Sequence, residues 1–219
     1  MLSNLSVEFE TKKVNVILGH NGAGKTTLFD LLTGVLIPSE GIINAPHENE
    51  IVYQLQGIPF LNILKGKDIV SLFLKSDVNK EISKITMESF HSLDTREKEL
   101  LERLWNLPVG KMSLGEKRWL IVSLICQMDR KLYIFDEPTS GVDPDSRIKL
   151  VKRLEELSKK ENTLVLMSTH ILHELEYLDC ILYLLHNEKI IFQGTYNEFL
   201  TLTETKNPDI AFYKLTTSI

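Results

Sequence analysis

The sequence predicts an α/β fold with a mainly parallel sheet, and three features of the chain carry that prediction. Short apolar runs rich in β-branched residues alternate with helical segments, as buried parallel strands alternate with helices. Several of these runs end abruptly in glycine or in acidic residues. Two further runs flank Asn187, which is typical of an antiparallel hairpin. We therefore expect a parallel core with a small antiparallel β portion.

Composition limits the class of protein. The 219 residues, of which 43% are hydrophobic and 25% charged, are typical of a folded globular domain. The formal net charge of -5 opposes a role in coating nucleic acid, so we expect no nucleic-acid partner. The two cysteines, Cys126 and Cys180, have no metal-binding spacing, and no apolar stretch approaches the ~20 residues that span a bilayer. Because the start of the chain lacks a signal-peptide pattern, we expect it to be cytoplasmic.

The first predicted unit is a strand, a glycine-rich loop and a helix. Residues 14–18 (VNVIL) form a short apolar run between charged residues and Gly19, which indicates a buried parallel strand. Residues 25–33 (KTTLFDLLT) predict a helix that ends with Gly34 at its C-cap. The loop between them contains the strongest motif of the chain.

The middle of the chain predicts more helix than strand. Residues 51–53 indicate a short strand, and three weakly amphipathic helical segments follow between about 68 and 105. A more apolar helix is expected at roughly 115–127, and it leads into a buried strand at 132–135 (LYIF). That strand ends directly in two acidic residues.

The last part of the chain returns to alternating strands and helices. Pro144 suits the first position of a helix that runs to about Leu157. An N–H at that position has no partner within the helix, so proline, which lacks the N–H, loses no hydrogen bond there. Residues 163–167 (TLVLM) predict another buried strand. Residues 181–185 and 190–193 are the two strands of the expected hairpin.

Residues 19–26 (GHNGAGKT) match the pattern GxxxxGKT between the first predicted strand and helix. In this pattern, backbone N–H groups wrap phosphate oxygens, Lys25 meets the terminal phosphates and the Thr26 hydroxyl coordinates Mg²⁺. The pattern arises by chance in roughly one per cent of chains of this length, and its place between a strand and a helix makes chance rarer still. We therefore predict a P-loop NTPase core. The expected nucleotide-binding residues of this loop are Gly19, His20, Asn21, Gly22, Ala23, Gly24, Lys25, Thr26 and Thr27.

Two carboxylates follow the strand at 132–135. Asp136 closes the strand, where a P-loop nucleotidase holds its Mg²⁺ with a second carboxylate. Glu137 is the next residue, and a carboxylate in that place can orient or deprotonate an attacking water. On its own the pair would indicate a solvated acidic turn, but beside a P-loop it predicts a hydrolytic site.

Three segments make the chain similar to ABC-type ATPases over most of its length. They are IFDEP at 134–138, Ser113-Leu-Gly-Glu at 113–116, and Thr169-His170. The resemblance implies a single ABC ATPase domain over 1–219, with an ABC-type helical subdomain of approximately 58–112 inserted into the nucleotide-binding core. It also implies ATP and Mg²⁺ as cofactors.

The family signature, written LSGGQ, precedes the second acidic motif by a fixed interval. The 23-residue separation of Ser113 and Asp136 matches that interval. Met112 and Leu114 depart from the consensus, which puts the efficiency of the signature in question. Ser113 and Gly115 are retained, and the resemblance implies that they touch the γ-phosphate bound by the opposite subunit.

The family's switch glutamine follows a short strand, where this chain offers Gln54 and Gln56. We favour Gln56, because it follows the Ile-x-Tyr pattern at the usual register and Asp68 falls 12 residues later. Gln54 is then expected to be a strand residue.

Two further residues match by resemblance. Asp143, in Ser-Gly-Val-Asp, resembles the D-loop that joins the two sites of a dimer, and His170 resembles the switch histidine that contacts the γ-phosphate and positions Glu137. The expected catalytic residues are Glu137, His170, Lys25 and Gln56, and the expected metal ligands are Thr26, Gln56 and Asp136.

These expectations combine into one functional prediction. The chain is expected to be the ATP-hydrolysing subunit of an ABC transporter, peripheral on the inner face of the cell membrane. Its expected partners are integral membrane subunits and a second ATPase subunit, either itself or a homologue, in an ATP-sandwich dimer. The alternative is a soluble ABC ATPase outside transport, such as an assembly scaffold or a DNA-repair head. An inactive nucleotide sensor is opposed by Glu137 and His170.

The base-binding side departs from the family pattern. Similar proteins place an adenine-stacking aromatic residue more than 20 residues ahead of the P-loop, whereas 18 residues precede Gly19 here. Stacking contributes about 1–3 kcal/mol. The expectation is weak ATP binding with poor discrimination against GTP, unless Phe9 covers the base after a shift in register.

Overall fold

The computed structural model describes residues 2, 5–57, 60–77, 87, 90 and 92–217. One six-stranded sheet lies at the centre of these residues. The strand order is β2-β3-β4-β1-β5-β6, with every neighbouring pair parallel except the antiparallel pair β5 and β6. The strands are β1 (Val14–Leu18), β2 (Ile51–Gln54), β3 (Leu132–Asp136), β4 (Leu164–Ser168), β5 (Cys180–His186) and β6 (Lys189–Thr195). The predicted parallel sheet with a small antiparallel portion is confirmed.

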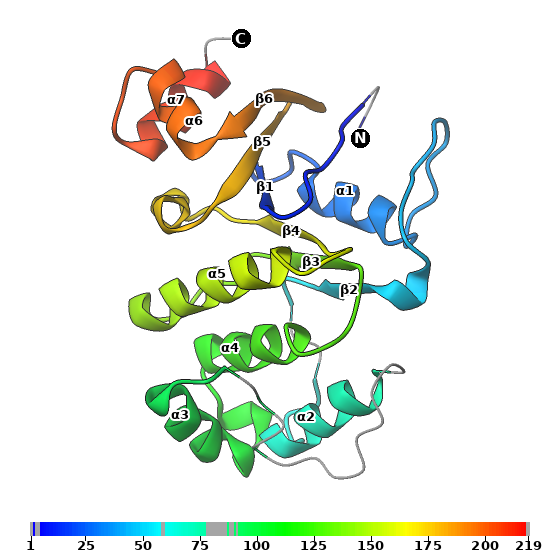
Figure 1. Ribbon diagram of the computed structural model, residues 1–219, viewed down its shortest axis with the longest axis vertical. Helices are drawn as coiled ribbons and strands as arrows, with labels where there is room; N and C mark the ends of the chain where they lie inside the picture. The colour runs from blue at the N-terminus through cyan, green and yellow to red at the C-terminus, as the bar shows by residue number, and fades with distance from the viewer. Residues whose placement is uncertain are drawn as a thin grey trace.

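Helices cover the sheet and extend beyond one edge of it. The α-helices are α1 (Lys25–Leu32), α2 (Gly66–Lys75), α3 (Thr95–Trp105), α4 (Leu114–Ile125), α5 (Pro144–Ser158), α6 (Tyr196–Leu202) and α7 (Pro208–Thr217). Short 3-10 turns are η1 (Glu48–Glu50), η3 (Val109–Lys111) and η4 (Leu172–Tyr177). In Figure 1, α5 lies next to the sheet, α4 lies beyond it, and α2 and α3 form the far end of the molecule, opposite α6 and α7.

Most predicted elements are confirmed, with small shifts at their ends. The first helix ends at Leu32 and is capped by Thr33, while Gly34 follows the cap with a positive φ of 76°. The apolar helix expected at 115–127 begins at Leu114, because Ser113 caps it. Of the three helical segments expected between 68 and 105, α2 and α3 are present, and the segment between them falls largely outside the described residues. No element is predicted after residue 193, where the structure adds α6 and α7.

The apolar runs are continuous because both faces of the sheet are buried. Along β1, Val14 and Val16 belong to the core cluster that includes α4 and α5, whereas Ile17 belongs to a second cluster with Phe29 of α1. Each of these side chains is fully buried. Alternate residues of one strand therefore face two different hydrophobic layers.

Asn15 is the polar exception in this strand, and it is fully buried. Its Oδ1 accepts hydrogen bonds from the backbone N–H of Glu10 (2.8 Å) and from the hydroxyl of Tyr183 (3.1 Å). Its Nδ2 donates to the backbone oxygens of Glu10 (2.8 Å) and Val165 (3.2 Å). The Asn15 amide therefore fastens the segment ahead of β1 to the middle of the sheet.

Among the described residues, no helix has the length and apolar character needed to span a membrane.

Replacing Asn15 with alanine should destabilise the protein by about 3 kcal/mol, because it leaves buried partners without hydrogen bonds. Tyr183→Phe is the matched control, since it removes one hydroxyl from the same cluster and should cost about 1 kcal/mol. Urea unfolding followed by circular dichroism measures both. A loss for Asn15→Ala no larger than that for Tyr183→Phe would contradict the assigned role.

Candidate functional site

The predicted phosphate loop connects β1 to α1, and its backbone requires glycine. Gly22 and Gly24 have φ values of 81° and 104°, in the left-handed region that L side chains rarely adopt. A Cβ on Gly19 would lie 2.6 Å from the backbone oxygen of Leu185 in β5. The loop can therefore hold this shape, with backbone groups close to a ligand, only with glycine at these positions.

Lys25 lies across this loop. Its Nζ donates hydrogen bonds to the backbone oxygens of Gly19 (2.7 Å) and His20 (3.1 Å). Burial lowers the pKa of the Lys25 ammonium, and the nearby carboxylates of Glu137 and Asp136 partly oppose that shift. The ammonium is thus held over the mouth of the loop, where terminal phosphates are expected.

Asp136 lies beside the start of α1, as an oxygen ligand for a cation would. The Thr26 hydroxyl donates to Asp136 Oδ2 (3.3 Å), and the Ser168 hydroxyl donates to Oδ1 (2.5 Å). Asp136 and Ser168 are direct partners in the parallel register of β3 and β4, and the Asp136 side chain is buried. Carboxylate and hydroxyl oxygens are the ligands that Mg²⁺ prefers, so this donor set fits that ion.

Glu137 contacts two other residues that the sequence predicts for the site, Gln56 and His170. His170 Nδ1 lies 3.2 Å from Glu137 Oε1, and the Gln56 side-chain amide donates to Oε2 (3.0 Å). The three residues follow β2, β3 and β4, which are neighbours in the sheet. Their meeting follows from the rule that the carboxyl ends of parallel strands share one edge.

The backbone of Glu137 is unusual, since its φ of 53° is rare for a residue with a side chain. Its N–H donates to Ser168 Oγ (3.0 Å). Strain of this kind persists only where surrounding contacts impose it, and it concentrates at functional sites.

The two glutamines take different places. Gln54 is the last residue of β2, is buried, and donates to the backbone oxygens of Leu55 and Asp136. Gln56 is exposed and reaches the Glu137 carboxylate. The structure thus brings Gln56 to the carboxylate and leaves Gln54 as a strand residue behind it.

The signature residues form a separate group. Ser113 caps α4 through a reciprocal pair: its hydroxyl accepts from Glu116 N–H (3.1 Å), and the Glu116 carboxylate accepts from Ser113 N–H (2.7 Å). A Cβ on Gly115 would collide with the backbone oxygen of Gly141, in the segment that ends at Asp143. Asp143 in turn caps α5 by accepting from Ser146 N–H. In the described part of the chain, no hydrogen bond joins Ser113 or Asp143 to the phosphate loop.

A buried polar network lies behind the site. The hydroxyls of Thr139 (3.0 Å) and Thr169 (2.6 Å) both donate to Glu174 Oε1, and burial raises the pKa of the Glu174 carboxyl. The network joins the segment after Glu137 to the residue before His170. Glu174 was not singled out from the sequence, because it lies in a polar stretch without a distinguishing pattern.

Ser168 and Arg118 were also missed. Ser168 is the hydroxyl residue that ends an apolar strand just before Thr169-His170, and this position is a signal in retrospect. Arg118 is a charged residue at the head of the apolar run 119–126, and it is buried in α4. Its guanidinium reaches both Glu137 and Gln56.

Phe9, the residue considered for the base, packs elsewhere. Its ring meets Tyr183 edge-on, with the ring centroids 5.2 Å apart. The Phe9 ring therefore belongs to the layer around Tyr183 and is not a free stacking platform. The expected weakness of base recognition stays a prediction.

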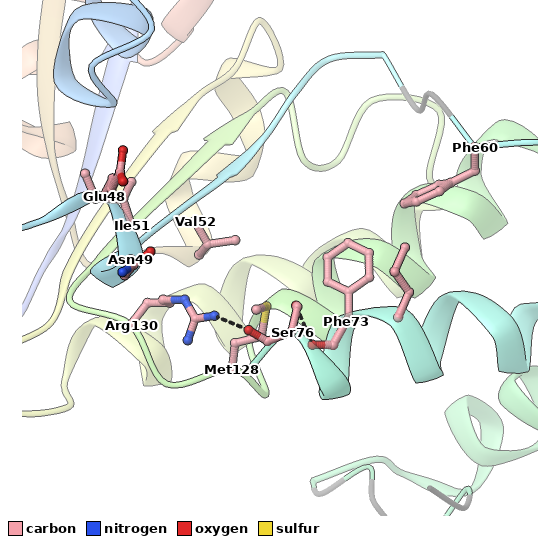
Figure 2. A pocket seen from close by; sticks show the side chains of 10 residues that line it. Glu48, Asn49, Ile51, Val52, Phe60, Phe73, Ser76, Met128 and Arg130 are labelled. Carbon is pink, nitrogen blue, oxygen red and sulfur yellow. Dashed lines mark hydrogen bonds between the residues drawn. The ribbon is translucent and has the colours of Figure 1, made fainter. Parts of the chain in front are cut away.

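A hollow of about 420 Å³ lies apart from this site, between the edge strand β2 and helix α2. Figure 2 shows Phe60 and Phe73 on its apolar side and Arg130, Asn49 and Glu48 on its polar side. The Phe60 and Phe73 rings are in edge contact, with centroids 6.1 Å apart. Leu72, which also lines the hollow, is 55% exposed.

Comparison with known proteins gives a consistent result. A family profile described as "ABC transporter" matches residues 2–140. The chain is 30% identical over 210 residues to the energy-coupling factor transporter ATP-binding protein EcfA1 of Thermotoga maritima, a match that covers 91% of this chain and 78% of that protein. It is 29% identical over 224 residues to the lantibiotic transport ATP-binding protein SrtF of Streptococcus pyogenes, covering 98% and 93%.

Solved structures share the fold. An ATP-binding subunit of an ABC transporter superposes with a TM-score of 0.80 at 23% identity, covering 99% of this chain and 93% of that one. A dimeric ATP-binding cassette in a post-hydrolysis state, bound to ADP and phosphate, superposes with a TM-score of 0.69 at 15% identity, covering 89% and 90%. At these identities the superpositions support the fold alone.

Proposed function

This chain belongs to the ABC transporter family as an ABC ATPase domain, and we propose that it powers a transporter by closing with a second ATPase subunit around two ATP molecules. Members of this family bind and hydrolyse ATP. The observation that carries the proposal is that Gln56 and His170 both contact the Glu137 carboxylate, next to the Thr26–Asp136 pair. This arrangement is suited to activating a water molecule beside bound phosphates.

The residues divide between binding and chemistry. The loop from Gly19 to Thr27 and the Lys25 ammonium would bind the phosphates of ATP, aided by the positive N-terminal end of α1. Thr26, Asp136 and Gln56 would hold Mg²⁺, since all three offer side-chain oxygens. Bound Mg²⁺ would neutralise charge on the phosphate oxygens.

Glu137 would act as the base. One carboxylate oxygen is held from the Gln56 side and the other from the His170 side, so rotation of the carboxylate is restricted. A base that is fixed before the reaction loses little entropy when it engages water. His170, whose side chain is 58% exposed, would also face the terminal phosphate.

Glu137→Gln should therefore bind ATP normally but lose on the order of a hundredfold or more in turnover, because a positioned general base contributes about 10²–10⁴. Lys25→Ala should lose binding as well, since it removes the charge over the phosphates. Calorimetric titration and a phosphate-release assay separate the two effects, with chelation of Mg²⁺ as a control that stops turnover in the wild-type chain. Turnover retained by Glu137→Gln would eliminate Glu137 as the base.

A second subunit is proposed because the signature residues lie apart from their own phosphate loop. Ser113 is exposed at the N-terminus of α4, where the helix dipole favours an anion. Ser113 and Gly115 would contact the γ-phosphate bound by the facing subunit, and Asp143 would lie between the two sites. The facing subunit is a second copy or a homologous ATPase chain.

Size-exclusion chromatography tests this arrangement. Glu137→Gln should be mostly monomeric without nucleotide and should elute as a dimer in excess Mg-ATP, because the γ-phosphate completes the contact. Adding Ser113→Arg should block the dimer while ATP still binds at the phosphate loop. An elution volume that does not change with saturating Mg-ATP would count against a dimer of identical chains.

The hollow between β2 and α2 is the proposed docking place for a membrane subunit. It belongs to the proposed helical subdomain, approximately 58–112, together with the edge of the sheet. Its apolar side, with Phe60, Leu72 and Phe73, suits an apolar helix face, and its polar end suits the end of such a helix. The chain would then lie at the cytoplasmic face of the membrane. A scaffold or repair ATPase would have no membrane partner there.

Leu72→Glu should remove this partner and leave the chain's own ATPase rate unchanged, because Leu72 is half-exposed and belongs to α2, at the far end of the molecule from the sheet in Figure 1. Leu202→Glu in α6 is the matched control, since Leu202 is 63% exposed at the opposite end. The measurement is copurification of the tagged chain from detergent-solubilised membranes of its host. A stoichiometric multi-span membrane protein should be retained by the wild type and Leu202→Glu and lost by Leu72→Glu. Capture of no membrane protein by the wild type would favour the soluble alternative.

A further inference from the structure

Arg118 joins two parts of the site through their backbones. One NH₂ group of its guanidinium donates to the backbone oxygen of Glu137 (2.6 Å), and the other donates to the backbone oxygen of Gln56 (2.7 Å). The side chain comes from α4, one turn after the signature, and only 3% of the residue is exposed. Arg118 therefore spans the loops that follow β2 and β3.

Burying the Arg118 guanidinium costs free energy, and another interaction must offset that cost. The two hydrogen-bond acceptors are neutral carbonyl groups, and Nε has no hydrogen-bond partner among the described residues. Burial lowers the pKa of the Arg118 guanidinium, and the charges of Glu137 and Asp136 partly oppose that shift. A buried cation with incomplete pairing is unfavourable for folding alone.

The contact with the Glu137 backbone offsets the cost of burying Arg118. The left-handed conformation of Glu137, with φ of 53°, is strained and persists only where surrounding contacts impose it. The N–H is held by Ser168 Oγ, and the carbonyl is held by Arg118 and, at 3.3 Å, by the N–H of Ser140. Arg118 is thus one of the groups that fix both the strained peptide and, through it, the direction of the carboxylate.

We propose that Arg118 is a positioning residue, which sets the separation of Gln56 and Glu137 and ties both to the signature helix of the same chain. The planar guanidinium fixes two donors in one geometry, so the two carbonyl groups are held at a set distance. The Gln56 side chain reaches the Glu137 carboxylate, so backbone and side-chain links close one ring. Because Ser113 begins the helix that carries Arg118, contact at the signature is transmitted to the carboxylate. This inference rests on the proposed role of Glu137.

The chain offers a matched control in Arg153. Its guanidinium also anchors to α4, by donating to Ser123 Oγ (2.7 Å), and pairs with Glu97 (2.8 Å), and its side chain is 12% exposed. Arg153→Lys removes another largely covered guanidinium without touching Glu137 or Gln56. Its effect measures what a lost guanidinium costs the fold.

The test compares Arg118→Lys and Arg118→Gln with Arg153→Lys in the purified chain. Lysine keeps the charge, but a single ammonium cannot reproduce the fork. The turnover number of both Arg118 variants should fall on the order of ten- to a hundredfold, as part of what a positioned base contributes. ATP affinity by calorimetry should be unchanged, and the melting temperature should fall no more than in Arg153→Lys. In the Glu137→Gln background, Arg118→Lys should cause no further loss of turnover.

Wild-type turnover in Arg118→Lys and Arg118→Gln would overturn the inference. A joint loss of ATP affinity, melting temperature and turnover beyond that of Arg153→Lys would also overturn it, since it would indicate a purely structural side chain. Additive losses in the double variant would do the same. The proposed function fails on a different result, namely turnover retained by Glu137→Gln alone, so the two failures are distinguishable.

Discussion

The carboxylate of Asp136 is buried, and the arrangement of the sheet's edge depends on how its two oxygens find partners. A buried carboxylate needs hydrogen-bond donors or a cation. Ser168 supplies one donor from the end of β4, which adjoins β3, and Thr26 supplies the other from the start of α1, which follows β1. The proposed Mg²⁺ site supplies the cation. The strand order β2-β3-β4-β1 places β3 where loops from both sides can reach it. A site of this kind therefore needs parallel neighbours, because antiparallel ones would send half of these loops to the opposite edge.

Glu137 combines a fixed backbone with releasable side-chain contacts. Its peptide is held by Ser168 and Arg118, which are both buried, whereas its carboxylate is held by Gln56 and His170, which are exposed. The exposed partners can move away without opening the core, because neither of them belongs to it. The strained peptide keeps the carboxylate aimed while its partners exchange.

Sequence reasoning predicted the parts of the site that are written in local patterns. The strands were recognisable because both faces of the sheet are buried, and the phosphate loop was recognisable because its shape requires glycine at fixed positions. Asn15 was hidden within an apolar run, since two of its hydrogen-bond partners, Val165 and Tyr183, are far from it in the chain. Arg118 gave no signal for a related reason: its partners are backbone oxygens, which exist at every position and leave no trace in the sequence.

The position of Gln56 links the hydrolytic site to the proposed docking hollow. Its side chain contacts Glu137, its backbone is held by Arg118, and Phe60, four residues later, lines the hollow beside Phe73. A partner that fills the hollow would contact Phe60, which is close in the chain to Gln56. Because that residue is held at both its side chain and its backbone, a displacement there would change the Glu137 contact before it disturbed the sheet. A change at the Glu137 contact would in turn alter the affinity of the hollow for its partner, since a thermodynamic coupling between two sites is reciprocal.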